Sequence, residues 1–402
     1  MTIDALCRVV DNYGDIGVVY RLARALSALP DPPRLRLVVD DLRAFSLLEP
    51  AVDPALPVQT LRGWTVLDWA GPDAAGSPPG SGARAYAEAY ADGPPLVVLE
   101  CFACGRPDWF EAILFDDGRY LDGAGAAPTR TIVNLEYLSA EAYPDEFHRL
   151  PSLTRSSSVR KHMFMPGFTP ATGGLIQDRE FAESLRLAGE LGSKRALRSA
   201  ISDGLGRAVD PDSFWALLFG YERDYGPIVE DLAARAQASP IVAFAAAGKS
   251  RPCVEAAWER AGRPFELVGL PFMRQQDWDR LVAAADFALV RGEDSLSRAA
   301  LAGIPFLWHA YPQGGDQALK VRGLLERMRP FFGPDDFAPI EAAFVDVNDR
   351  KVDGPTVRGY ERIGALLEPS VRVRAGFSAF SETLRKNGDL AANLMTFLRE
   401  IV

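Results

Sequence analysis

The sequence has little of what marks secreted or membrane proteins. Its 402 residues contain only four cysteines, which is too few for a disulfide framework in a chain of this length. No apolar run approaches the ~20 residues that a membrane-spanning helix needs. Residues 1–4 show neither the basic nor the apolar region of a signal peptide. These absences favour a cytoplasmic protein with reduced thiols and no membrane partner.

Positive charge is also scarce. The chain has 44 Lys and Arg against 54 Asp and Glu, a formal net charge of -10. The nearest approach to a basic block is residues 155–161, a short segment rich in serine. Because nucleic acids and anionic membrane surfaces attract basic patches, we expect neither as a partner.

What the chain does contain is a repeated alternation of short apolar runs with amphipathic helical patterns. The first half predicts strands at 5–10, 36–39, 96–99 and 131–135, with a helix at 18–29. The second half predicts strands at 214–219, 241–246, 265–268, 287–290 and 304–308, with helices at 227–237, 254–260, 276–285, 294–302 and 316–327. Such alternation is typical of doubly wound parallel sheets, which bind ligands at the carboxyl ends of their strands.

The length and two Gly/Pro-rich segments suggest how the chain is divided. At ~100–200 residues per domain, 402 residues predict two domains. A break at 166–174 places the boundary just after it, which gives domains at 1–177 and 178–385. The terminal helix, within 386–402, could pack back on the first domain. Residues 71–82, rich in Gly, Pro, Ser and Ala, are interpreted as a surface loop.

The first motif that can carry chemistry is residues 11–17, which follow the first strand. Two carboxylates, Asp11 and Asp15, stand four residues apart beside Gly14 and Gly17. The spacing is not G-x-G-x-x-G, and the acids would repel a phosphate, so the motif favours carboxylates presented to an acceptor. The alternative, that Asp11 or Asp15 only caps the next helix, stays open.

The second motif, residues 291–295, also joins a strand to a helix. Arg291 can form paired hydrogen bonds to a phosphate, Gly292 permits close approach, and Ser295 offers a hydroxyl at a helix start. Glu293 does not suit a phosphate and is better turned toward a sugar hydroxyl. The alternative is a capped helix with an exposed arginine.

Three further groups of residues bear on function. Phe219, Tyr221, Phe272, Gln275 and Trp278 lie where a base could stack, although such residues are more often packing groups. His309 is interpreted as a hydrogen-bonded structural histidine. Cys101 and Cys104 form a C-x-x-C without a second pair, so two inert thiols are favoured over zinc or redox chemistry. Nothing requires a divalent metal or another cofactor.

At several segments the sequence resembles the EarP family, protein-arginine rhamnosyltransferases that modify bacterial translation elongation factor P. The resemblance spans most of the chain in order. The matching segments are residues 7–17, 21–24, 134–141, 165–168, 291–295, 302–309 and 311–313.

The resemblance implies a GT-B fold, with two Rossmann-like α/β domains facing across a cleft. It also implies dTDP-β-L-rhamnose as donor, an arginine of elongation factor P as acceptor, and inversion at the anomeric carbon. The implied catalytic residues are Asp11, Asp15 and Glu293, with Asp15 as the general base. The implied substrate-binding residues are Asn12, Tyr13, Gly14, Phe219, Tyr221, Phe272, Gln275, Trp278, Arg291, Gly292, Asp294, Ser295 and Gln313.

Three other functions remain open. A glycosyltransferase of this fold could act on a small molecule or lipid, and a sugar-nucleotide epimerase shares the architecture. A non-catalytic protein that binds elongation factor P is the third. The identity of the sugar rests wholly on the resemblance.

Overall fold

A computed structural model describes residues 1–10, 13–72, 81–91, 93–118, 121, 128–311, 317–349 and 363–402. The chain forms two compact units. The first unit comprises Met1–Leu138, Tyr143–Ile176 and Gly388–Val402, and the second comprises Ser139–Ala142 and Gln177–Asn387. The expected boundary after residue 177 lies beside this division. The prediction of two α/β domains is confirmed.

The described residues of the first unit form a mixed sheet in the order β3-β4-β2-β1-β5-β6-β8-β7. The inner strands are all parallel, and β3 and β7 pair antiparallel at the two edges. The strands are β1 (Thr2–Cys7), β2 (Arg34–Val39), β3 (Val58–Leu61), β4 (Trp64–Asp68), β5 (Val97–Cys101), β6 (Arg130–Leu135), β7 (Pro151–Ser152) and β8 (Val159–Phe164).

The first strand lies earlier than the sequence predicts, at 2–7 rather than 5–10. Strand pairing of β1 ends at Cys7 because backbone N–H groups beyond it hydrogen-bond to carboxylates instead of to a neighbouring strand. Val9 N–H donates to Asp40 Oδ1 at 2.7 Å, and Val10 N–H donates to Asp15 Oδ2 at 2.7 Å. The apolar residues Val9 and Val10 therefore belong to the loop that leads toward the first motif.

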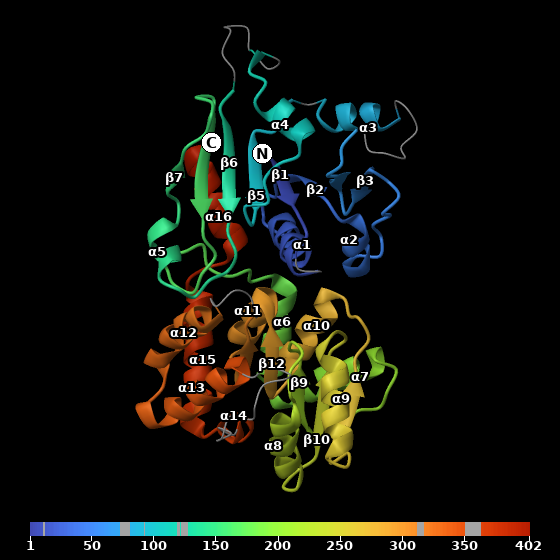
Figure 1. Cartoon of the computed structure of the whole chain (residues 1–402), viewed down its shortest axis with the longest axis vertical. Helices are drawn as coiled ribbons and strands as arrows, with labels where there is room; N and C mark the ends of the chain where they lie inside the picture. The colour runs from blue at the N-terminus through green and yellow to red at the C-terminus, as the bar shows by residue number, and fades with distance from the viewer. Residues whose placement is uncertain are drawn as a thin grey trace. The chain divides into compact units, whose positions relative to one another are not determined.

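Helices cover both faces of this sheet (Figure 1). One face packs on α1 (Gly14–Ser27), α2 (Leu42–Leu48) and the chain's last helix, α16 (Leu390–Ile401). The other packs on α3 (Ser81–Ala89) and α4 (Asp108–Leu114), through Tyr86, Tyr90 and Phe110. A short helix, α5 (Tyr143–Phe147), precedes β7. Of the expected loop at 71–82, residues 73–80 lie outside the described residues, and α3 already begins at Ser81.

The second unit carries a wholly parallel sheet in the order β11-β10-β9-β12-β13, and every strand predicted for it is present. Its strands are β9 (Phe214–Leu218), β10 (Ile241–Ala245), β11 (Glu266–Gly269), β12 (Phe287–Arg291) and β13 (Phe306–His309). Its helices are α6 (Arg179–Ala188), α7 (Leu191–Gly204), α8 (Gly226–Ala236), α9 (Ser250–Arg260), α10 (Gln275–Ala284), α11 (Gly292–Ala302), α12 (Gln317–Met328), α13 (Pro334–Asp349), α14 (Gly364–Leu367) and α15 (Val371–Lys386), with a 3-10 turn at Arg329–Phe331.

The residues of β9, β10, β12 and β13 are nearly all buried, which is why these strands appear in the sequence as continuous apolar runs. Across the described ranges, no helix is long and apolar enough to span a membrane.

Candidate functional site

The first unit presents one carboxylate at the carboxyl end of its central strand. Asp15 lies in the first turn of α1 and is 3% exposed. Its Oδ2 accepts the Val10 N–H at 2.7 Å, and its Oδ1 accepts the Tyr137 hydroxyl at 2.8 Å. Both donors belong to segments outside the helix, so they hold the carboxylate at the helix start from two sides. Such an anion also interacts favourably with the positive end of the helix dipole.

Sheet pairing brings Tyr137 to this carboxylate. Leu135, the last residue of β6, pairs with Cys101 of β5, and its carbonyl accepts the Phe102 N–H at 2.6 Å. The Phe102 and Tyr137 rings then stack with centroids 4.4 Å apart and planes 14° apart. Sequence reasoning missed Tyr137 and Phe102 as site residues, although Tyr137 belongs to a segment that carries the family resemblance.

The other predicted residues of this motif lie around the start of α1. Tyr13 is the residue before the helix and is 37% exposed, and Gly14 is the exposed first residue of α1. Asp11 and Asn12 lie outside the described residues.

In the second unit, Arg291 ends β12 and precedes α11. Its guanidinium carbon lies 4.6 Å from the ring centroid of Phe219 and 4.8 Å from that of Tyr221. These aromatic residues follow β9, the strand beside β12. A guanidinium stacked on two rings is restrained while its N–H groups keep their planar arrangement, which suits binding of a phosphate.

The turn after Arg291 is shaped for close approach of a ligand. Gly292 has φ +63°, a left-handed conformation that favours glycine. Its carbonyl accepts the Trp308 Nε1–H at 3.0 Å, which anchors the turn to β13. Asp294 lies in the first turn of α11, and Ser295 follows with 8% exposure. The N-terminus of this eleven-residue helix can attract an anion.

Glu293, the carboxylate that does not suit a phosphate, lies near a lysine of the same unit. Its Oε1 lies 3.7 Å from Nζ of Lys320 on α12, and the two side chains are 26% and 37% exposed. Lys320 was not singled out from the sequence, because a lysine on an amphipathic helix carries no local signal of function.

The predicted aromatic group is divided by the structure. Trp278 packs edge-on against Phe219, with centroids 5.0 Å apart and planes 67° apart. Phe272 is 49% exposed, whereas Gln275 begins α10 with 7% exposure. The structure therefore brings Phe219, Tyr221, Trp278 and Arg291 together. Gln313 lies outside the described residues.

His309 contacts this cluster through Tyr221. It is 3% exposed, and its Nδ1 accepts the Tyr221 N–H at 3.2 Å. Burial, with a smaller contribution from the charges of Arg223 and Arg291, lowers the pKa of His309 to about 3. The neutral imidazole therefore orients Tyr221, which confirms the interpretation of His309 as structural.

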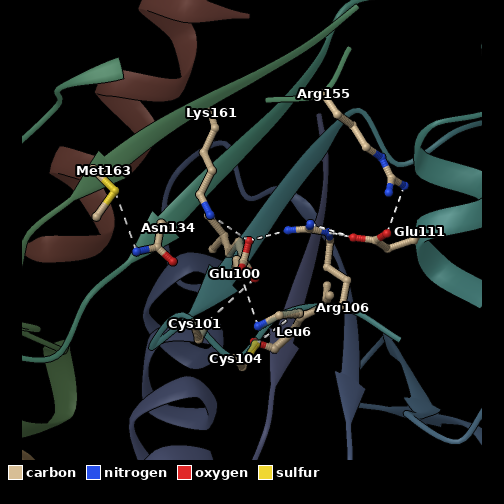
Figure 2. Close-up of polar contacts among 12 residues, drawn as sticks. Leu6, Glu100, Cys101, Cys104, Arg106, Glu111, Asn134, Arg155, Lys161 and Met163 are labelled. Atoms are coloured by element: carbon tan, nitrogen blue, oxygen red, sulfur yellow. Dashed lines mark hydrogen bonds and ion pairs between the residues drawn. The ribbon is translucent and has the colours of Figure 1, made fainter. Parts of the chain in front are cut away.

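The C-x-x-C thiols are protonated. Cys104 contacts the carbonyls of Leu6 and Gly105 at 3.4 and 3.3 Å, beside Glu100 and its basic partners (Figure 2). Burial, followed by the charge of Glu100, raises the pKa of Cys104 to about 12. Burial also raises the pKa of Cys101. Because the thiolate is the reactive form, both are inert at neutral pH.

The sequence of this chain is similar to those of known protein-arginine rhamnosyltransferases. A sequence model described as "Elongation-Factor P (EF-P) rhamnosyltransferase EarP" matches residues 3–399. A protein-arginine rhamnosyltransferase of Shewanella oneidensis is 38% identical over 332 residues, which cover 79% of this chain and 78% of that protein. One of Pseudomonas putida is 37% identical over 321 residues, which cover 78% of this chain and 77% of that protein.

A solved structure supports the fold. It is described as "Structural basis for EarP-mediated arginine glycosylation of translation elongation factor EF-P", and it aligns over 100% of this chain and 99% of its own with a TM-score of 0.58 and 23% identity. The two Rossmann-like units are thus those of the GT-B glycosyltransferase fold. The chain belongs to the EarP family.

Proposed function

We propose that this protein transfers L-rhamnose from dTDP-β-L-rhamnose to an arginine side chain of translation elongation factor P, with inversion at the anomeric carbon. The observation that carries the proposal is Arg291, stacked on Phe219 and Tyr221 at the start of α11. The names of the relatives supply the reaction class, and the description of the solved structure supplies the acceptor. A translation factor as acceptor also fits a cytoplasmic location.

The second unit supplies the donor half of the reaction. The leaving dTDP gains negative charge on its terminal phosphate as the bond from sugar C1 to oxygen breaks. Arg291, Ser295 and the N-terminus of α11 would bind that phosphate, and no divalent metal or other cofactor is proposed. Phe219, Tyr221, Phe272, Gln275 and Trp278 would hold the nucleoside, and Asp294 would fix the turn.

The first unit supplies the acceptor half. An arginine guanidinium is protonated at neutral pH and is a poor nucleophile. As its nitrogen bonds to sugar C1, a proton must leave that nitrogen, and the Asp15 carboxylate accepts it before releasing it to solvent. General base catalysis of this kind contributes ~10²–10⁴ in rate. Asp11 would orient Asp15 or the guanidinium, with Asn12, Tyr13 and Gly14 shaping the loop.

Glu293 is proposed to hold the sugar or the acceptor arginine. Its carboxylate accepts hydrogen bonds only, and Lys320 beside it shows that the position already attracts a cation. Gln313 belongs to the proposed donor site through its motif alone.

The test is incubation of the purified protein with elongation factor P and dTDP-rhamnose, followed by intact-mass measurement. One added deoxyhexosyl group on an arginine supports the proposal. Binding of elongation factor P with no added mass would indicate a non-catalytic binding protein. Conversion of the dTDP-sugar with no acceptor present indicates an epimerase, and transfer only to small molecules indicates the remaining rival.

Asp15→Asn tests the base assignment. It should abolish transfer and leave binding of dTDP-rhamnose intact, because the carboxamide cannot accept the proton. Asp41→Asn is the matched control: Asp41 caps α2 by accepting the Ala44 N–H at 2.8 Å, and asparagine caps equally well. Near wild-type turnover in Asp15→Asn would remove Asp15 as the base.

A further inference from the structure

Tyr137 makes a contact that core packing does not explain. Its side chain is 38% exposed, whereas the carboxylate it bonds belongs to a residue only 3% exposed. The O–H···O distance is 2.8 Å, and the two residues are 122 positions apart in the sequence. A partly exposed tyrosine whose hydroxyl donates to the carboxylate of a buried aspartate fits an electrostatic or orienting role, because a hydrogen bond to an ionised acceptor is about twice as strong as a neutral one.

The ring of Tyr137 is itself held by a strained segment. Phe102, which stacks on it, has φ +60°, and the next residue, Ala103, has φ +49°. Two successive non-glycine residues in the left-handed region are uncommon, and such strain persists only where the surrounding structure enforces it. Here the Phe102 N–H is tied to the carbonyl of Leu135 at 2.6 Å, two residues before Tyr137. The left-handed backbone at Phe102 and Ala103 thus places the Phe102 ring against the face of the Tyr137 ring.

We infer that Tyr137, supported by Phe102, is a positioning residue that fixes the carboxylate plane of Asp15 for proton transfer. This inference rests on the proposed role of Asp15 as general base. The Val10 N–H holds Oδ2 and the Tyr137 hydroxyl holds Oδ1, so each oxygen has a donor from a different segment. A carboxylate torsion is otherwise broad, and a base must lie within hydrogen-bond reach of the proton it removes.

The same unit contains a matched tyrosine–aspartate bond with a structural role. The Tyr90 hydroxyl donates to Asp4 Oδ1 at 2.8 Å, and Arg36 pairs with that carboxylate at 2.7 Å. Asp4 is 0% exposed and lies early in β1, so this bond supports the core.

The experiment compares Tyr137→Phe with Tyr90→Phe in full-length protein, using steady-state kinetics and thermal unfolding. Tyr137→Phe keeps the stacked ring and loses only the hydroxyl. It should lower kcat about 10- to 100-fold, the range expected for one hydrogen bond to a charged group, with an unchanged KM for dTDP-rhamnose and a smaller fall in the unfolding midpoint than Tyr90→Phe causes. Tyr90→Phe should lower the midpoint and leave kcat at the wild-type value.

Phe102 is tested by a double-mutant cycle. Phe102→Ala should lower kcat in the wild-type background and cause no further loss in Tyr137→Phe, because both act through one hydroxyl. Phe102→Tyr, which keeps the ring, should restore kcat. Independent, multiplying losses would show that Phe102 does not act through Tyr137.

Two results would overturn the inference about Tyr137. One is wild-type kcat together with wild-type KM values in Tyr137→Phe. The other is an unchanged kcat with a raised KM for elongation factor P, which would assign the hydroxyl to acceptor binding. Either result, alongside an inactive Asp15→Asn, removes only this inference. Full turnover in Asp15→Asn removes the proposed base instead, so the two failures are distinct.

Discussion

Nζ of Lys320 lies 3.7 Å from Oε1 of Glu293, linking α12 to the first turn of α11. Both side chains are partly exposed, and ion pairs of this kind contribute ~0–1 kcal/mol to stability. A guanidinium can form two parallel hydrogen bonds to a carboxylate, whereas an ammonium acts as a point charge. Under the proposed function, an incoming arginine or sugar would replace this weakly held lysine at Glu293.

The first prediction concerns this pair. Glu293→Gln should lower turnover by about tenfold or more, because one charged hydrogen bond to substrate is lost, and it should leave dTDP-rhamnose affinity unchanged. Lys320→Ala should leave the free energy of unfolding within about 1 kcal/mol of wild type. Steady-state kinetics and denaturant titration check these values. Wild-type kcat and KM in Glu293→Gln would remove Glu293 from the reaction.

The second prediction concerns Arg291. Arg291→Ala should weaken binding of dTDP-rhamnose by about 10- to 100-fold, because a charged hydrogen bond to the phosphate is lost. Isothermal titration calorimetry measures the affinity. Arg263→Ala is the matched control, since Arg263 also stacks on an aromatic ring, at 5.3 Å from Trp258, and pairs with Glu259 in an exposed i,i+4 bridge. Equal affinities in wild type and Arg291→Ala would exclude the phosphate role.

The third prediction follows from the pKa of His309, which burial lowers to about 3. An unfolded histidine has a pKa of ~6.5, so the unfolded state binds the extra proton first as the pH falls. The contribution of the neutral His309 to the free energy of unfolding is complete above about pH 6.5 and is lost progressively toward pH 3. The loss reaches about 2 kcal/mol by pH 5.

His309→Gln tests this pH dependence. Glutamine can still accept the Tyr221 N–H but does not titrate. Denaturant unfolding at pH 7 and pH 5 should therefore show a smaller loss of stability in the variant than in wild type. Identical losses in the two proteins would contradict a neutral, buried His309.

The fourth prediction concerns the strained segment after β5. Ala103 has φ +49°, so Ala103→Gly should raise the free energy of unfolding by about 1 kcal/mol. The same change at Ala112, exposed in α4, should lower it by about 1 kcal/mol, since glycine is a poor helix former. A loss of stability in Ala103→Gly would show that the segment is not strained.

Much of the second unit could be predicted from sequence. Strands such as Phe287–Arg291 are buried on both faces and appear as continuous apolar runs. The first unit was harder to predict. Val159–Phe164 was missed as a strand because Arg160, Lys161 and His162 interrupt it near the sheet edge, where β7 is its outer neighbour. The β3–β4 pair was missed as well, because its strands are short and mix polar with apolar residues.

The candidate site was only partly predictable. The stacking of Arg291 on Phe219 and Tyr221 follows from their positions at the ends of neighbouring strands. The phosphate-binding role of the turn at 291–295 was predicted from its residue types. The roles of Asp11, Asn12 and Gln313 stay predictions. Whether Asp15 would cap its helix or meet another segment could not be settled from residues 11–17.

The sequence by itself determined most local elements of the second unit: buried strands, the helices that follow them, and a strand-to-helix turn at Gly292. Those outcomes depend on neighbouring residues and on burial, which periodicity and composition record. Only the tertiary structure decided that Tyr137 bonds Asp15, that Phe102 stacks on Tyr137, and that Lys320 approaches Glu293. These contacts depend on which strands and helices become neighbours, and that order is set by long-range pairing across the whole unit.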